Sequence, residues 1–372
     1  GTPHGKAGSA GRRQRMGRQR TGTTMATSVN PFSSLGNTAP ADPLRDAYGR
    51  SVRYLRLSVT DRCNLRCLYC RSVEPRAFIP HDHILRYEEM ARVVRIAHGM
   101  GVRKVRLTGG EPFARKGFDG FLALLHKRHG DLDLRLTTNA TLIGPHIPLL
   151  RRAGVNVVNI SLDSFDRATF ARVTGRDLLP AVLEAVDGLL GAGLRVKINA
   201  VALRGVNDGQ LDDFVHAART LPVDVRFIEF MPMGSGTRWD ERQFWPAGEI
   251  LAEAGRLARL EADGAGGETS GPARMFRVVG GRGRLGVISP LSNHFCAACN
   301  RLRLTSDGNV RACLFADTEY PLRELLRTPG TDDVRIARVI GEACRRKPVG
   351  AELLAARRGT AVADRHMVGI GG

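Results

Sequence analysis

The sequence predicts an α/β fold in which parallel strands alternate with helices. Two observations support this class: short β-rich runs recur between amphipathic stretches, and several of those stretches end at Gly just before the next run. Six strand–helix units follow one another, which is two short of a closed eight-stranded barrel. Both an incomplete, TIM-like (βα)6 barrel and an open doubly wound sheet fit this count.

Six runs have the composition of buried strands, because each is rich in apolar and β-branched residues. They are YLRLSVT (54–60), VRKVRLT (102–108), LDLRLTTN (132–139), VNVVNISLD (155–163), LRVKINAVAL (194–203) and VDVRFIEFM (223–231). Amphipathic patterns between them predict helices, for example over 86–101 and 180–193. Because parallel strands end at one rim, we expect the polar residues that follow them to lie together.

The alternation of strands and helices changes after Met231. Residues 261–273 have the composition of a loop or linker, and 280–315 show short strand patterns and turns without a helical period. We therefore predict four parts. They are a disordered basic extension over 1–40, the partial barrel over 41–234, a smaller region with the second cysteine group over 235–345, and a C-terminal tail over 346–372.

The chain has 372 residues and a formal net charge of +19. Residues 1–30 contribute six basic side chains and no acidic one, so the remainder is also basic. Such a charge favours anionic partners, namely nucleic acid, a membrane surface or a polyphosphate. No run approaches eighteen consecutive apolar residues, so neither a membrane span nor a membrane partner is expected.

The cysteines indicate the compartment. There are seven, and six of them fall into two groups of three, which is typical of metal binding in a reducing environment rather than of disulfides. We therefore expect a cytoplasmic protein. The Arg-rich, acid-poor residues 1–30 leave a mitochondrial transit peptide as the alternative, and Met25 is a second candidate for the start of translation.

The first cysteine group is Cys63-x3-Cys67-x2-Cys70, directly after the first predicted strand. Thiolates are soft ligands that suit zinc, copper(I) or iron–sulfur clusters. Three thiolates on one loop can reach three irons of a four-iron cluster, and an open metal position usually exists because a small molecule binds there. The alternatives are a zinc site completed by a distant residue, or partly buried free thiols.

The second group is Cys296-x2-Cys299-x13-Cys313, which again supplies three thiolates and implies an open iron. The alternative is a zinc ribbon whose fourth ligand is His294 or Cys344. Cys344 itself lies in a helical pattern, which indicates a plain thiol.

The first group resembles the signature of the radical S-adenosylmethionine (SAM) enzymes, with Tyr69 as the aromatic residue before the last cysteine. The resemblance implies a six-unit partial barrel and a [4Fe-4S] cluster that SAM completes and that splits SAM into a 5′-deoxyadenosyl radical. The segment Gly109–Pro112 matches the family's segment for the SAM amino group, which makes Gly110 a SAM contact. Ser161 and Met231 match other SAM-contacting positions.

Together, the two groups resemble the GTP 3′,8-cyclase family of molybdenum-cofactor biosynthesis, from about Arg53 to Gly372. Other matching stretches are RLTGGEP, LTTN, NISLD, VKIN, RFIEFMP and the terminal Gly pair. The resemblance implies a second [4Fe-4S] cluster whose open iron binds the purine of GTP. It also implies a radical that removes hydrogen from ribose C3′, after which C3′ attacks C8 to give (8S)-3′,8-cyclo-7,8-dihydro-GTP.

Basic residues on the predicted strands suit a triphosphate, because Arg forks bind phosphate oxygens in pairs. Structural ion pairs are the alternative for any single one of them. The resemblance places GTP contacts at Arg56, Arg106, Thr137, Lys197, Arg301, Leu302 and Arg303, and the strand positions add Lys104 and Arg226.

The end of the chain and one turn complete the resemblance. In the family the C-terminal tail enters the active site and is needed for activity, which gives Gly371 and Gly372 a catalytic role here. One departure is Ala140, which stands where the family commonly has Gly after TTN.

Two other functions compete with this one. A radical enzyme that acts on a peptide would need further cysteines, and only Cys344 is left over. A basic zinc or iron–sulfur protein that binds nucleic acid fits the charge, but no groove-reading motif occurs, so no specific nucleic acid is expected. The expected partners are GTP, a reducing electron donor, cyclic pyranopterin monophosphate synthase as the next enzyme and, as one option, a second copy in a homodimer.

Overall fold

The computed structural model describes residues 1, 44–70, 77–264, 271–356 and 362–371. All but the first residue of the predicted disordered extension, and part of the predicted 261–273 linker, lie outside these ranges. The described strands form one twelve-stranded sheet in the order β12-β11-β10-β1-β2-β3-β4-β5-β6-β9-β8-β7. Its two edge strands do not pair with each other, so the barrel is open.

The strands have the following bounds: β1 (Tyr54–Ser58), β2 (Lys104–Thr108), β3 (Asp133–Thr138), β4 (Val155–Ser161), β5 (Arg195–Ala202), β6 (Asp224–Glu229), β7 (Leu260–Ala262), β8 (Arg274–Val278), β9 (Arg284–Ile288), β10 (Arg301–Leu304), β11 (Asn309–Arg311) and β12 (Tyr320–Pro321). Strands β1 to β6 are mutually parallel and in sequence order. Each lies inside one of the six predicted runs, so the prediction of an incomplete six-unit parallel barrel is confirmed.

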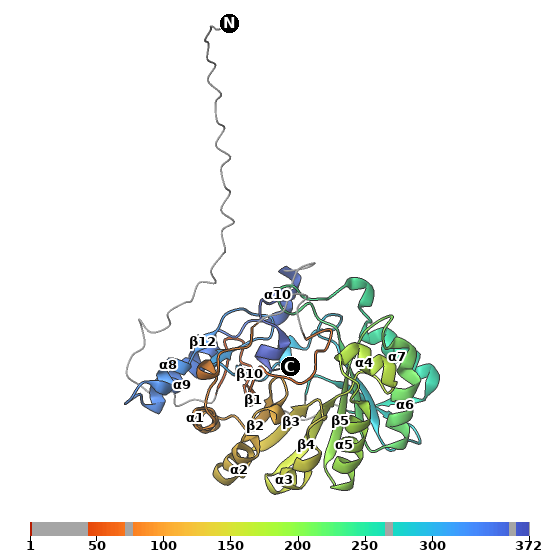
Figure 1. Ribbon diagram of the computed structural model, residues 1–372, viewed down its shortest axis with the longest axis horizontal. Coiled ribbons are helices and arrows are strands. Elements are labelled where there is room, and N and C mark those ends of the chain that lie inside the picture. Colours follow the sequence, from red (N-terminus) through yellow and green to blue (C-terminus); the bar gives the residue numbers. More distant parts are fainter. Residues whose placement is uncertain (2–43, 71–76, 265–270, 357–361, 372) are drawn as a thin grey trace.

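The helices are α1 (Tyr87–Gly99), α2 (Phe118–Arg128), α3 (Ile147–Arg152), α4 (Arg167–Thr174), α5 (Leu179–Gly191), α6 (Leu211–Thr220), α7 (Ala247–Leu257), α8 (Arg323–Arg327), α9 (Asp333–Arg345), α10 (Gly350–Ala356) and α11 (Met367–Ile370). Helices α1 to α6 follow the parallel strands and lie outside the sheet, as Figure 1 shows. Among the described residues, no helix has the length and apolarity to cross a membrane.

Helix α1 shows how the sequence specifies these elements. Its apolar residues Met90, Val94 and Ala97 recur at helical spacing and are buried against the sheet. Glu89 accepts a hydrogen bond from the Arg86 backbone N–H at 2.6 Å, which satisfies a free donor at the helix start. The core therefore lies between the helices and the sheet, and the inner side of the sheet is left for polar groups.

The strands after residue 234 extend the same sheet at both ends. Strand β9 pairs with β6 at one end, and β10 pairs with β1 at the other, both in parallel. Residues 289–300 therefore run from one end of the parallel sheet to the other, and they carry Cys296 and Cys299. Helix α7, in this region, was not predicted from the sequence.

The register of the sheet aligns four arginines in one row. Arg303 is opposite Arg56, Arg56 is opposite Arg106, and Arg106 is opposite Arg135. Residues that are paired in a parallel sheet point to the same face, and all four of these side chains line the inner cavity.

Candidate active site

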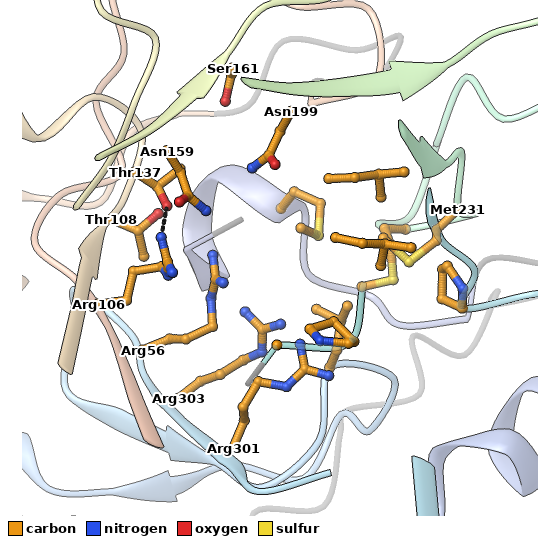
Figure 2. Close-up of a pocket in the computed structure, with 18 of the residues that line it drawn as sticks. Arg56, Arg106, Thr108, Thr137, Asn159, Ser161, Asn199, Met231, Arg301 and Arg303 are labelled. Atoms are coloured by element: carbon orange, nitrogen blue, oxygen red, sulfur yellow. Dashed lines mark hydrogen bonds between the residues drawn. The ribbon is translucent and has the colours of Figure 1, made fainter. Parts of the chain in front are cut away.

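The inner side of the sheet encloses a cavity that contains both cysteine groups. All six grouped cysteines line it. So do the predicted residues Arg56, Tyr69, Lys104, Arg106, Gly110, Thr137, Ser161, Lys197, Arg226, Met231, Arg301 and Arg303. Figure 2 shows Arg56, Arg301 and Arg303 pointing into the cavity from one wall, with Ser161 and Asn199 on the opposite wall.

The first cysteine group lies on a loop that the neighbouring elements hold in place. Backbone hydrogen bonds of 2.8 Å and 3.0 Å join Arg66 and Leu68 of this loop to the end of α4. The Asn139 side-chain amide lies 3.6 Å from the Cys63 Sγ. Burial, together with the negative charges of Cys70 and Asp163, raises the pKa of Cys67 well above its ordinary value. A bound metal would have to supply the charge that favours the thiolate.

The glycines that follow β2 bring the backbone close to this loop. A Cβ on Gly110 would lie 2.2 Å from the Arg62 carbonyl oxygen, so only Gly fits there. Glu111 is buried and accepts hydrogen bonds from the Asn139 N–H at 2.7 Å and the Thr138 hydroxyl at 2.8 Å. Burial raises the pKa of Glu111 to about 7. The carboxyl group therefore fixes the turn rather than facing a ligand.

Tyr69 connects the first cysteine loop to the ends of β4 and β5. Its hydroxyl donates to the Asp163 carboxylate at 2.6 Å, and Asp163 also accepts from the Val201 N–H at 2.9 Å. Sequence reasoning missed Asp163, and it also missed Asn159 and Asn199, whose side-chain oxygens are buried without a hydrogen-bond partner among the described residues. Their positions on strands with alternating burial were the available signal.

The second cysteine group closes around Gly350. A Cβ at Gly350 would lie 3.0 Å from the Cys313 Sγ and 3.4 Å from the Cys296 Sγ, so both thiols contact this backbone. Burial would raise the pKa of Cys299, but the positive charges of Arg301 and Lys347 and hydrogen bonds from Arg301 lower it to about 6. This thiol is therefore poised as a thiolate ligand.

The thiols of each group lie where they could serve as ligands of a cluster. In the described part of the chain, no three His, Cys, Asp or Glu side chains converge tightly enough to hold one metal ion. A four-iron cluster places each thiolate on a different iron, so its ligands need not converge. Of the two residues considered as a fourth zinc ligand, Cys344 is buried in the main core, and His294 Nδ1 donates to the Pro290 carbonyl oxygen at 2.6 Å; neither side chain is among the residues that line the cavity.

The arginine row faces the cavity, and Arg135, at one end of the row, forms an ion pair with Asp133 at 2.7 Å. Arg106 contacts the Tyr54 hydroxyl, the Leu136 carbonyl at 3.3 Å and the Thr137 hydroxyl at 3.4 Å. Burial and the charges of Arg56 and Arg301 hold the pKa of Arg303 well below its ordinary value. Burial and the neighbouring arginines thus disfavour the charged form of Arg303, and a bound anion would favour it.

Tyr54 lies against the arginine row, where its hydroxyl accepts a hydrogen bond from Arg106 Nε. Burial would raise the pKa of Tyr54, but the charges of Arg106, Arg56 and Arg301 and the hydrogen bond from Arg106 lower it to about 7. Sequence reasoning missed this residue, because a Tyr on a buried strand is ordinarily a packing residue.

The two predicted lysines are ion-paired. Lys197 Nζ lies 2.9 Å from the Asp224 carboxylate, and Lys104 Nζ lies 3.9 Å from that of Asp133. Burial is the main cause that lowers the pKa of each to about 8. Arg226 has a pKa lowered to about 9, first by burial and then by Arg106, and two of its side-chain nitrogens lack a partner in the described part of the chain.

The C-terminal tail enters the same cavity. The Gly371 carbonyl accepts from Arg303 Nη1 at 2.8 Å and from Arg56 Nε at 3.4 Å. Gly371 has φ +80°, and a Cβ there would lie 2.6 Å from the Thr108 side chain. Gly372 lies outside the described residues. Leu302 points into the main core, because it alternates with the cavity-facing Arg301 and Arg303 on β10.

Comparison with known proteins shows which families the chain matches. Residues 57–218 match the Radical SAM superfamily, and residues 223–353 match Molybdenum Cofactor Synthesis C. The chain is 44% identical over 315 residues to GTP 3′,8-cyclase of Rhodobacter capsulatus, which covers 83% of this chain and 92% of that protein. It is 40% identical over 299 residues to GTP 3′,8-cyclase of Thermodesulfovibrio yellowstonii, with coverages of 78% and 91%.

Solved structures share the fold at lower sequence similarity. Streptococcus suis SuiB bound to S-adenosylmethionine has a TM-score of 0.54 and 14% identity, over 88% of this chain and 77% of that one. Native anSMEcpe with bound AdoMet has a TM-score of 0.51 and 16% identity, over 80% of this chain and 82% of that one. At these identities the likeness concerns the fold alone.

Proposed function

The chain belongs to the GTP 3′,8-cyclase family of SAM-dependent radical enzymes, and we propose that the cavity lined by both cysteine groups holds two iron–sulfur clusters, SAM and GTP together. The family's reaction converts GTP into 3′,8-cyclo-7,8-dihydro-GTP in molybdenum-cofactor biosynthesis. The observation that supports the proposal is that both cysteine triads and the arginine row open into the same cavity.

Each triad is assigned to a [4Fe-4S] cluster with one iron left open. Cys63, Cys67 and Cys70 hold the first, and Cys296, Cys299 and Cys313 hold the second. When bound, the first cluster and SAM supply the radical that starts the reaction. Cys296, Cys299 and Cys313 would hold the second cluster so that its open iron would be available to the purine of GTP.

The residues near the first triad bind and orient SAM. The close approach of Gly110 to the Arg62 carbonyl leaves its backbone facing the cavity for the SAM amino group. Ser161, the last residue of β4, and Met231, which follows β6, line the cavity. The Tyr69–Asp163 hydrogen bond holds the loop that carries Tyr69 near the end of β4. These residues position SAM beside the substrate, which is a large part of what a radical enzyme contributes.

The arginine row binds the GTP triphosphate. A triphosphate carries about four negative charges, and Arg forks bind phosphate in pairs. Arg56, Arg106 and Arg303 face the cavity. Burial lowers the pKa of Arg56 to about 10 and holds the pKa of Arg303 well below its ordinary value, so an incoming polyphosphate stabilises their charged forms. Lys197 and Lys104 contribute less, because Asp224 and Asp133 already neutralise part of their charge. Thr137 holds the Arg106 fork at 3.4 Å.

The tail and an outside electron donor complete the site. Gly371 lies against the phosphate-binding arginines, so the tail borders the substrate and limits the access of water. Reductive cleavage of SAM consumes one electron, which a separate donor must supply. The triphosphate product leaves for cyclic pyranopterin monophosphate synthase.

Metal content tests the proposal. We expect about eight irons and eight sulfides per chain after anaerobic reconstitution, and about four of each when Cys296, Cys299 and Cys313 are changed to Ser together. The variant should still cleave SAM slowly but should no longer cyclise GTP. Cys344→Ser is the matched control, because this thiol lies in the core away from the cavity and its loss should leave the iron content unchanged.

Two outcomes would count against this assignment. Zinc in place of iron at the second site would remove the iron to which the purine binds. An iron content that did not fall in the triple variant would show that these cysteines hold no cluster.

A further inference from the structure

Lys347 is a buried cation at the second cysteine triad. It follows α9 and is only 2% exposed. Its ammonium donates to the Arg301 carbonyl at 2.9 Å and to the Ala312 carbonyl. Arg301 lies two residues after Cys299, and Ala312 directly precedes Cys313. One ammonium group therefore joins the two chain segments that carry these thiols.

Arg50 binds the backbone at Cys296, the remaining cysteine of this triad. Its Nη1 donates to the Cys296 carbonyl at 2.7 Å, and its Nη2 donates to the carbonyls of Lys347 at 3.0 Å and Pro348 at 3.1 Å. Asp46 forms an ion pair with Arg50 and holds its fork in place. Arg50 and Lys347 thus connect the backbone at all three cysteines.

The charge of Lys347 has no carboxylate to balance it. Within the described ranges, its ammonium makes only the two carbonyl contacts, and no ion pair involves it. A buried ammonium group without a counter-charge is strongly unfavourable. Lys347 interacts electrostatically with Cys299 of the triad. Lys347 also lines the cavity into which the three thiols open.

We propose that Lys347 is a positioning residue for the second cluster: it fixes the Cys299 and Cys313 segments, and its charge compensates that of the thiolate-bound cluster. The proposal rests on the proposed function, in which this triad holds a cluster. Cluster potentials respond to nearby charge and hydrogen bonds. A cation at this place favours the more negative, reduced state, so it raises the reduction potential of the second cluster and slows the loss of its iron.

Three substitutions of Lys347, each made in the full-length protein, separate the effect of its charge from the effect of its hydrogen bonds. Lys347→Met removes both, so we expect faster loss of iron, from about eight towards about four per chain in the presence of a chelator. Lys347→Gln keeps a donor for the carbonyls but removes the charge, so iron should remain while the second cluster's potential becomes more negative. Lys347→Arg should resemble the wild type in both properties. Electron paramagnetic resonance during a redox titration gives the potential of each cluster.

The first cluster and a surface arginine provide the controls. The potential of the first cluster should not move in any variant. Arg346→Gln removes a charge one residue away, where the side chain is 61% exposed and paired with Glu342, and should change neither property.

The outcomes are distinct. An unchanged potential and iron content in both Lys347→Met and Lys347→Gln would overturn the role of Lys347 while leaving the second cluster in place. A wild-type chain that took up only about four irons would overturn the second cluster itself, and this inference with it.

Discussion

The pKa of Tyr54 depends on the positive charge of the arginines around it in the cavity. Its pKa is lowered to about 7 because three arginines surround it, against the opposing effect of burial. Between about pH 7 and 10 the unfolded chain holds a proton that the folded chain has released. The unfolded state then binds more protons, so stability rises with pH across this window.

Tyr54→Phe should flatten that rise and remove one phenolate from the near-ultraviolet titration. In the wild type we expect Tyr54 to titrate near neutral pH without GTP, and at higher pH with GTP, because the phosphates bring competing negative charge. The difference spectrum between wild type and Tyr54→Phe isolates this residue. A difference spectrum with no step below the ordinary phenol range, or a step that GTP does not move, would contradict the prediction.

Ala140 shows a second feature at this scale. It has φ +64° and is buried, which places an alanine in the left-handed region that favours glycine. This conformation costs a non-Gly residue roughly 1–2 kcal/mol. Glycine would remove this strain, but it would itself destabilise the protein by about 0.4–1 kcal/mol, because it raises the entropy of the unfolded chain. The departure from the family's TTNG turn therefore stores strain beside the first cysteine loop.

Ala140→Gly should accordingly raise the free energy of unfolding by roughly 0.5–1 kcal/mol. Ala153→Gly is the matched control, since Ala153 is also buried but has φ −86°, so glycine should destabilise the protein there. Denaturant titration of both variants gives the comparison. Equal destabilisation by the two substitutions would mean that Ala140 carries no strain.

At the scale of elements, the C-terminal tail is held well before it reaches the cavity. Residues 362–364 form backbone hydrogen bonds with 232–235, the segment that follows Met231. The Arg365 fork binds both oxygens of Asp307, at 3.0 Å and 2.8 Å, and its Nε lies 2.8 Å from the Glu319 carboxylate. The tail is thus anchored on one side to the turn between β10 and β11 and to the residue before β12, and on the other side to the segment that follows β6.

Arg365→Ala should release the tail while leaving the clusters in place. Hydrogen bonds to charged groups contribute roughly 1.5–3 kcal/mol, so amide exchange over 362–371 should accelerate by about tenfold to a hundredfold. GTP turnover should fall, because Gly371 would no longer be held against Arg303. Arg345→Ala serves as the control, since its ion pair with Glu342 lies on the surface. Unchanged exchange in the tail would remove Arg365 as its anchor.

Local sequence patterns were sufficient to predict the six parallel strands. All six parallel strands were found because their apolar runs are short and regularly separated. Helix α7 was missed although Ala247, Ile250 and Ala254 recur at helical spacing and are buried, so a local signal was available there. Lys347 and Arg50 were missed for another reason: their partners are backbone carbonyls about 35 to 300 positions away, and no local pattern records such contacts.

For the whole molecule, the sequence predicted the class of fold and the residues around the cavity, but not how the sheet ends. The pairing of β1 with β10 joins positions separated by most of the chain, and only the structure places Arg303 beside Arg56. The cavity could be predicted because parallel strands bring their carboxyl ends together. The row of four arginines could not, because it depends on register across β10, β1, β2 and β3.

The pairing of β1 with β10 also determines how late this part of the sheet can form during synthesis of the chain. A ribosome makes β1 early and β10 about 240 residues later. At roughly 5–20 residues per second, the outer edge of β1 waits about 12–50 seconds for its neighbour. Throughout that interval the nascent chain presents an open strand edge, beside a cysteine loop already made and an arginine row still lacking Arg303. Newly synthesised chains are therefore most exposed to mispairing just before their last seventy residues emerge.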